Sequence, residues 1–373
     1  MNFEFSDEQR ALRDQARKFL ADRGALDRAR QVLEGGASFD RGLWREMAEM
    51  GWPGTAVPEP DGGAGFGYLE LCVIAEELGR TLAPTPFASS VYLFTEAVLL
   101  HGSPAQRRRL LPALASGETI GCLALAEGPR PPTPDGLTTR MRDGRVSGVK
   151  VPVPDGDVAG EAVVAAADDA AGGVTLCLVD LTGPGVRREA VATVDPSRPH
   201  ARVQLEAAPA EPLGAPGQGW ALLERLLDRA AVLLAFEQVG GAEAALHMAR
   251  DYALGRFAFG RPIGSFQAIK HKLADVYVAV ELARSNAYYG AWALSTGAPE
   301  LPVAAAVARV SASEAFAHAA RENVQTHGGM GFTWEFDCHL YYRRAELLGL
   351  QLGSVRRWKE ALIARVEAAR AAS

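Results

Sequence analysis

Helix-type and strand-type hydrophobic patterns occupy separate stretches of this 373-residue chain, and this separation restricts the fold more than any single motif does. The first third and the stretch after Gly219 carry apolar residues at intervals of three and four, as packed helices do. From about Thr119 to Leu213 the pattern changes to short β-type runs separated by Gly, Pro and Asp clusters. This order excludes the alternating strands and helices of a Rossmann domain. We expect an α+β fold with an N-terminal helical domain (1–118), a middle β domain (119–213) and a C-terminal helical bundle (214–373).

Individual elements follow from the same patterns. Ser6 and Gln9 have the spacing of a helix capping box, and Tyr68–Leu82 has helical periodicity. Four runs predict strands: Val146–Val153, Glu161–Ala167, Val174–Asp180 and Ala201–Glu206. In the last part, an apolar stripe predicts a long packed helix whose inward residues are Phe266, Ile269, Leu273, Val276, Val280 and Ala283. Two further helices are predicted at Val303–Gln325 and Val355–Ala369.

Composition and charge exclude several classes of protein. The net charge of -6 and pI of about 5.7 argue against nucleic-acid binding. Apolar stretches such as Ala230–Phe236 are far shorter than the roughly 20 residues of a membrane span. Met1–Gln9 has no signal-like apolar region, which predicts a cytoplasmic protein. Four widely spaced cysteines, Cys72, Cys122, Cys177 and Cys338, predict buried thiols and no metal site.

Two sequence blocks carry a resemblance to a known family. Arg256–Gln267 contains an Arg, a Phe-Gly pair and a Phe-Gln pair, and Gln325–Phe332 reads Gln-x-x-Gly-Gly-x-Gly-Phe. Glu76–Arg80 (Glu-Glu-Leu-Gly-Arg) and the turn around Gly62-Gly63 agree as well. At these spacings the chain resembles the flavin-dependent acyl-CoA dehydrogenases over nearly its whole length. The resemblance implies FAD as cofactor and α,β-dehydrogenation of an acyl thioester, carried by coenzyme A or by a carrier protein.

The resemblance also implies roles for residues of both blocks. Arg256 would grip the flavin pyrophosphate, Phe259 would pack on the adenosine or flavin face, and Gln267 would offer an amide. In the second block, the cofactor-binding positions are Gln325, Gly328 and Gly329, whose backbone would approach the adenine end. In the family these groups serve the flavin of a neighbouring subunit, so at least a dimer is implied. Taken singly, each of these residues also has an interpretation without a cofactor. Arg256 could be a solvated surface charge, Phe259 could be a core residue, and Gly328-Gly329 could be a simple turn.

The carboxylate that normally removes the α-proton is missing from its usual positions. Aligning Arg343-Arg344-Ala345 on the family pattern places that Glu at Leu352, and the other position known in the family falls on Ala230. Leu352 cannot accept a proton, but its backbone N–H can still bind the thioester oxygen, so we assign it to substrate binding. Glu237 is the candidate base within this chain, with a purely structural role as the alternative. Asp228 matches an acid close to the family's acyl-CoA contact residue, which predicts a place near the substrate.

The β domain also departs from the family where it contacts the flavin ring. The usual Thr-Glu-Pro motif corresponds to Ala126-Glu127-Gly128, and the usual Trp and Thr correspond to Pro152 and Pro154. The adenine and pyrophosphate contacts therefore look intact, whereas the ring-side contacts do not.

Three functional hypotheses remain open at this point. The chain is an FAD-binding acyl-CoA dehydrogenase-type oxidoreductase, in a homo-oligomer or as the base-lacking subunit of a hetero-oligomer with a related dehydrogenase chain. It is otherwise a scaffolding homologue without catalysis, or a flavoenzyme with different thioester chemistry.

Overall fold

The computed structural model describes residues 6–372; Met1–Phe5, within the segment searched for a signal peptide, lie outside this range. By internal contacts the chain forms two compact units. The first comprises residues 1–30, 68–83 and 231–373, and the second comprises 31–67 and 84–230. The helices α2 and α7 contribute residues to both units.

The helices and strands have the following bounds. The helices are α1 (Asp7–Asp22), α2 (Ala25–Gly35), α3 (Arg41–Glu49), α4 (Tyr68–Arg80), α5 (Glu96–His101), α6 (Pro104–Ala115), α7 (Gly219–Gly255), α8 (Gln267–Thr296), α9 (Leu301–His327), α10 (Cys338–Leu350) and α11 (Val355–Ala372). The strands are β1 (Gly121–Ala124), β2 (Arg140–Arg142), β3 (Arg145–Pro154), β4 (Glu161–Asp168), β5 (Val174–Asp180), β6 (Val186–Val191), β7 (His200–Pro209), β8 (Glu211–Leu213), β9 (Phe257–Ala258) and β10 (Arg261–Pro262).

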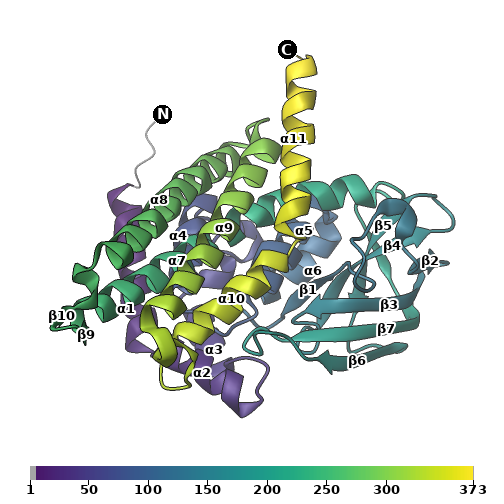
Figure 1. Cartoon of the computed structure of the whole chain (residues 1–373). Helices are drawn as coiled ribbons and strands as arrows, with labels where there is room; N and C mark the ends of the chain where they lie inside the picture. Colours follow the sequence, from purple (N-terminus) through teal and green to yellow (C-terminus); the bar gives the residue numbers. More distant parts are fainter. Residues whose placement is uncertain (1–5, 373) are drawn as a thin grey trace. The chain divides into compact units, whose positions relative to one another are not determined.

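The first unit is a helical bundle around α8 and α9. These two helices are joined by a short connection and pack along their lengths, and α10 and α11 pack on α9 (Figure 1). Alanines make the close packing possible, because residues such as Ala305, Ala308 and Ala312 place only a methyl group between neighbouring helices. Because α8 and α9 run in opposite directions, the start of α8 and the end of α9 lie at the same end of the bundle.

The second unit contains an eight-stranded sheet with the order β6-β7-β3-β2-β4-β5-β8, in which β1 pairs with β4 in parallel (Figure 1). Its apolar core includes Val146, Val164, Val179 and Val203. Val146 and Val203 alternate with more exposed residues along β3 and β7, whereas Val164 and Val179 lie in the continuously buried stretches of β4 and β5.

The predicted fold class is confirmed: a helical N-terminal part, a small sheet and a C-terminal helical bundle. The capping box forms, with Gln9 N–H donating to Ser6 Oγ at 3.2 Å and Ser6 N–H to Gln9 Oε1 at 3.0 Å. The four predicted strands and three predicted C-terminal helices are present, all but Val174–Asp180 with shifted ends, and the four cysteines are buried free thiols. None of the helices within residues 6–372 is both long and apolar enough to cross a membrane.

Candidate functional site

The two sequence blocks lie close to each other at one end of the helical unit. Arg256 N–H donates to Tyr252 O at 2.8 Å, and the Tyr252 ring stacks on His327 with ring centroids 4.0 Å apart. Lys272 and Glu322 form an ion pair of 3.2 Å between α8 and α9 at the same end. Residues 75 and 50 positions apart in the chain are therefore held together by direct contacts.

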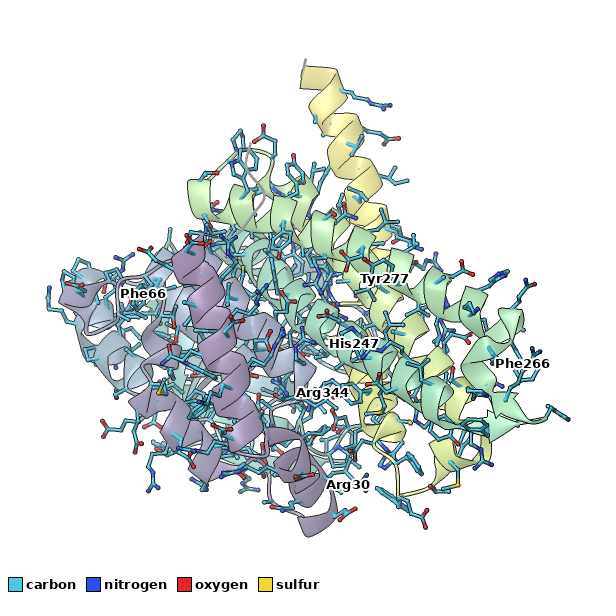
Figure 2. The ribbon with its side chains drawn as sticks, turned by 90° about the vertical axis from the view of Figure 1, so that its left-hand side faces the viewer. Arg30, Phe66, His247, Phe266, Tyr277 and Arg344 are labelled. Carbon is cyan, nitrogen blue, oxygen red and sulfur yellow. The ribbon has the colours of Figure 1, made fainter. Side chains whose placement is uncertain are left out.

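The first block forms a small hairpin of β9 and β10 ahead of α8. Phe259 and Gly260 at its tip both have positive φ, the backbone of a tight type I′ turn. Positive φ is unfavourable for phenylalanine, yet the Phe259 side chain is 96% exposed and gains little from packing. Figure 2 shows the neighbouring Phe266 at the outer end of α8, where the Arg261 guanidinium lies 4.0 Å from its ring centroid. A strained and exposed aromatic tip is typical of a surface that binds something.

Arg256 and the glycines of the second block are open to a ligand. The Arg256 side chain is exposed, and its guanidinium has no ion pair or hydrogen bond with any residue in 6–372. Gly328, with φ +60, and Gly329 are also exposed, and a Cβ added at either would meet nothing within 4 Å. Gln267 and Gln325 are exposed as well. These groups offer a free cation, amides and bare backbone on one end of the bundle.

The segment that follows the glycines is held by an arginine of α2. Arg30 Nη1 donates to Trp334 O at 2.6 Å, and Arg30 Nε donates to Asp337 Oδ1 at 3.1 Å. The Arg343 guanidinium lies 5.8 Å from the Trp334 ring centroid on the other side. The turn is therefore fixed in shape although much of it is exposed.

Leu352 lies in the turn between α10 and α11 with φ +62. Its carbonyl accepts a hydrogen bond of 3.1 Å from Trp358 Nε1. The Gln351 and Gly353 amides are bonded to Leu347 O and Leu350 O, whereas the Leu352 N–H has no acceptor among the residues that the structure describes. Leu352 is half-buried, so its N–H is a free donor in a partly shielded turn.

Arg309 of α9 is completely buried and holds this turn. Its Nη2 donates to Gln351 O at 2.5 Å and to Leu348 O, and its Nη1 donates to Gln238 Oε1 at 2.6 Å and to Ser313 Oγ at 2.5 Å. Burial lowers the pKa of Arg309 to about 9, so the guanidinium stays charged at neutral pH. Carbonyls at a helix C-terminus are a favourable partner for such a charge.

Glu237, the candidate base, is buried against another arginine. Its Oε1 lies 3.8 Å from Arg344 Nη1, and both side chains are 1% exposed. Arg344, labelled in Figure 2, also donates to Leu82 O at 3.3 Å. This geometry favours the structural alternative for Glu237, because its carboxylate compensates the charge of a buried guanidinium.

Asp228 and Ala230 belong to the second unit. Both are buried on α7, and Ala230 leaves only a methyl group at the second family position for the base. Between them Arg229 Nε bonds Glu96 Oε1, a pairing that the sequence did not suggest. Position 230 therefore offers no carboxylate that could act as the base.

The positions predicted to face the flavin ring, Pro152 and Pro154, follow a buried lysine on β3 that forms an ion pair. Lys150 Nζ, which is fully buried, bonds Glu127 Oε1 at 2.7 Å, and Glu127 also accepts from Thr138 and Thr139. Burial by itself raises the pKa of Glu127, but the hydrogen bonds from Lys150 and Thr138 outweigh it and lower the pKa to about 2. Pro152 and Pro154 offer no hydrogen-bond donor.

The Glu76–Arg80 motif is part of a helix crossing and not of a ligand site. Arg284 of α8 bonds Glu76 and Glu243, and Arg80 bonds Glu77 and Glu243. Figure 2 labels His247, which follows Glu243 by one turn of α7. These buried pairs join three helices of the first unit.

A separate cavity of about 550 Å³ lies in the second unit between the α2–α3 connection and Val158. None of the residues predicted to bind cofactor or substrate lines it.

Comparisons with known proteins agree with this geometry. Residues 6–118 match the acyl-CoA dehydrogenase N-terminal domain and residues 217–365 match the C-terminal domain. The chain is 37% identical to acyl-CoA dehydrogenase IpdE2 of Mycobacterium tuberculosis, with 91% of each chain covered. The chain belongs to the acyl-CoA dehydrogenase family. It is thus an oxidoreductase of the acyl-CoA dehydrogenase type, in a family that is flavin-dependent.

Solved structures of this family have the same fold. A variant of the Tcur3481-Tcur3483 steroid ACAD has a TM-score of 0.88 and 33% identity, with 98% of this chain and 99% of that chain covered. The ChsE4-ChsE5 complex from Mycobacterium tuberculosis has a TM-score of 0.89 and 28% identity with the same coverage.

The residues of this chain suit the diphosphate and adenine end of the family's FAD better than they suit its flavin ring. The free guanidinium of Arg256 and the open backbone at Gly328 and Gly329 suit a diphosphate and an adenine brought by another molecule. By contrast, Pro152 and Pro154 lack the groups that would contact a flavin ring. The residues present therefore fit the nucleotide end of the cofactor.

Sequence reasoning missed Arg309, Trp358 and Arg30. For Arg309 a signal existed, since it lies on the alanine-rich face with Ala305, Ala312 and Phe316 at steps of four, three and four. A charge on a face otherwise built for burial indicates a buried polar network. Trp358 bonds a backbone oxygen, and Arg30 bonds a backbone oxygen and a carboxylate about 300 positions away, and no sequence pattern indicates such contacts.

Proposed function

We propose that this chain is the base-lacking subunit of an acyl-CoA dehydrogenase, which shares FAD with a related partner chain and takes part in α,β-dehydrogenation of an acyl-CoA. The observation that carries this proposal is the Leu352 turn. It retains a free N–H for a thioester oxygen but has no acid at the position where the family keeps its base.

FAD, when bound, would accept a hydride from the β-carbon of the substrate. Arg256 would hold its pyrophosphate with paired charge-assisted hydrogen bonds, and Gly328 and Gly329 would admit the adenine end without a side chain in the way. The Leu352 N–H would stabilise negative charge on the thioester oxygen as the α-proton leaves. The acceptor of that proton would be a carboxylate of the partner chain.

The names of relatives support this division of labour and the substrate class. Two of the similar structures, Tcur3481-Tcur3483 and ChsE4-ChsE5, carry paired chain names, which favours a hetero-oligomer for this chain too. The first is called a steroid ACAD, so steroid acyl-CoA thioesters join short-chain ones as candidate substrates. Relatives above 30% identity are named acyl-CoA dehydrogenases, which favours coenzyme A over a carrier protein.

Scaffolding without flavin is the second candidate. It is favoured by Pro152, Pro154 and the Lys150–Glu127 ion pair at the ring-side positions. Visible absorbance separates the two: a complex with the partner is yellow if this chain completes a flavin site. If the partner chain binds as much flavin alone as it does in the complex with this chain, the result supports scaffolding.

Exchange of the substrate α-proton with deuterium tests the missing base. The unmodified chain, with acyl-CoA bound in deuterium oxide, is expected to show no exchange, because no carboxylate stands at position 352 or 230. Leu352→Glu is expected to introduce exchange, and Leu352→Gln, of similar size but unable to act as a base, is the control. Rapid exchange by the unmodified chain alone, abolished by Glu237→Gln, would assign the base to Glu237 and refute the proposal.

A further inference from the structure

The peptide group between Gln351 and Leu352 is bonded on one side only. In a trans peptide the carbonyl and the N–H point in opposite directions within one plane. The Gln351 carbonyl accepts from Arg309 Nη2 at 2.5 Å, and the Leu352 N–H of the same peptide has no acceptor among residues 6–372. Fixing the carbonyl therefore also fixes the direction in which the free N–H points.

Arg309 is a rigid anchor for this peptide. Its guanidinium is 0% exposed and its two terminal nitrogens bond four oxygens on three helices or their ends: Gln238 on α7, Ser313 on α9, and Leu348 and Gln351 at the end of α10. A side chain held by four bonds has little rotational freedom left, so it cannot release the Gln351 carbonyl without leaving several groups unsatisfied.

The charge on Arg309 also strengthens the donor. A cation bonded to a peptide carbonyl draws electron density from the amide nitrogen, and chains of hydrogen bonds polarise one another in a dry interior. The Leu352 N–H is therefore a stronger donor than an amide whose carbonyl faces water. A donor that is already oriented costs no reorganisation when charge develops on its acceptor.

We propose that Arg309 is a positioning residue, which orients and polarises the 351–352 peptide so that the Leu352 N–H binds the thioester carbonyl of the substrate. This inference rests on the proposed function, because it needs a thioester at Leu352. The Leu352 carbonyl belongs to the next peptide and is held by Trp358 Nε1, so the two contacts can be separated by mutation.

The test is isotope-edited infrared spectroscopy of bound thioesters on the full chain. Butyryl-CoA and cholyl-CoA labelled with ¹³C at the thioester carbonyl serve as probes. On the unmodified protein we expect the carbonyl band to move to lower frequency than in free solution. Arg309→Lys is expected to lose most of this shift while the thioester still binds, and Trp358→Phe is expected to keep it. Turnover in the complex with a partner chain should fall by up to about 10²-fold in Arg309→Lys, mainly in kcat, the scale of losing one oxyanion donor.

Arg309→Met provides a second variant, since it removes the buried charge together with its bonds and fills a similar volume. In the unmodified protein, amide hydrogen exchange at Leu352 should slow when a thioester binds. An unchanged band shift in both Arg309 variants would overturn the inference and leave the proposed function standing. An equal loss in Trp358→Phe would also overturn it, since the cause would then be a loosened turn. Absence of any shift on the unmodified protein would refute both proposals.

Discussion

Two buried arginines meet neighbouring residues of α7, and their partners differ in charge. Arg344 faces the carboxylate of Glu237, whereas Arg309 faces the neutral amide of Gln238 and backbone carbonyls. A buried charge is tolerated only when it is neutralised or well bonded. Glu237 is thus explained by its partner, and Arg309 is explained by the turn that it holds.

Glu237→Gln should therefore act on stability. Removing the carboxylate leaves the Arg344 charge buried without compensation, and breaking a buried pair in this way costs about 3–5 kcal/mol. We expect a loss of about this size in the free energy of unfolding, measured by denaturant titration, with Glu360→Gln on the exposed face of α11 as the control. Unchanged stability with abolished turnover would instead make Glu237 the base.

The Glu127–Lys150 pair gives a dependence on pH. Because the folded-state pKa of Glu127 is about 2, below its ordinary value of 4.5, the pair stabilises the fold above pH 4.5, and this contribution is lost as the pH falls toward 2. The difference in unfolding free energy between the unmodified protein and Glu127→Gln should be constant near neutrality and should shrink between pH 4.5 and 2. A difference that does not vary over this range would contradict the assigned pKa.

At the scale of single residues, the sequence predicts candidate positions but not their partners. Arg256, Gly328 and Gly329 are predicted from motifs that resemble those of the family, and the structure shows all three exposed. The partners of Glu237 and Gln351 come from α10 and α9, and such long-range contacts depend on helix packing that no local pattern encodes.

Among the helices of the first unit, α4 and α7 approach each other closely at two glycines. A Cβ on Gly79 would lie 1.8 Å from Glu237 O, and one on Gly240 would lie 1.9 Å from Glu76 O. Each glycine thus lets the backbone of the other helix approach. This approach brings Glu243 of α7 within reach of Arg80, and Arg284 bonds both Glu76 and Glu243.

Gly79→Ala should destabilise the protein by about 3 kcal/mol or more, since the added methyl overlaps backbone that cannot rotate away. Gly349→Ala is the matched control: this glycine is inside α10, and a Cβ there would meet nothing within 4 Å. The control should change the unfolding free energy by less than about 1 kcal/mol, toward greater stability. Equal effects of the two substitutions in thermal or chemical unfolding would show that the crossing is not tightly packed.

Element prediction succeeded where the hydrophobic pattern was long. The predicted strand Val174–Asp180 has the bounds of β5, and α9 and α11 extend their predicted ranges by two or three residues. The helix α8 begins one residue after Phe266 and continues thirteen residues past Ala283, the last residue of the predicted stripe. The strands β1, β2, β6 and β8 were missed. They are short, or polar at the sheet edge, or interrupted by proline, and their pairing depends on distant strands.

On the scale of the whole molecule, the chain exposes groups that another chain's cofactor could contact. The residues predicted to bind the nucleotide are exposed, and the Arg256 side chain has no partner among residues 6–372. Together with Pro152 and Pro154 at the positions predicted to face the flavin ring, they support the proposal that this chain completes a cofactor site without forming one alone. This asymmetry is a prediction from local motifs that resemble those of the family. The sequence could not predict the rigid turn at Leu352, which depends on Arg309.

Arg256→Ala should weaken flavin retention by the complex. Loss of a charge-assisted contact of about 1.5–3 kcal/mol corresponds to a roughly 10- to 100-fold weaker affinity for FAD. Arg250→Ala is the control, since Arg250 is also exposed but is paired with Asp251. Flavin content after gel filtration measures the effect, and equal retention by both variants would remove Arg256 from the site.

The stoichiometry of flavin tests the central claim most directly. The chain is purified alone and with a co-expressed related dehydrogenase chain, and FAD per polypeptide is measured by absorbance together with turnover of acyl-CoA. We predict fewer flavins than chains in the complex, and turnover only when both chains are present. One flavin per chain in the isolated protein, with full turnover, would contradict the account.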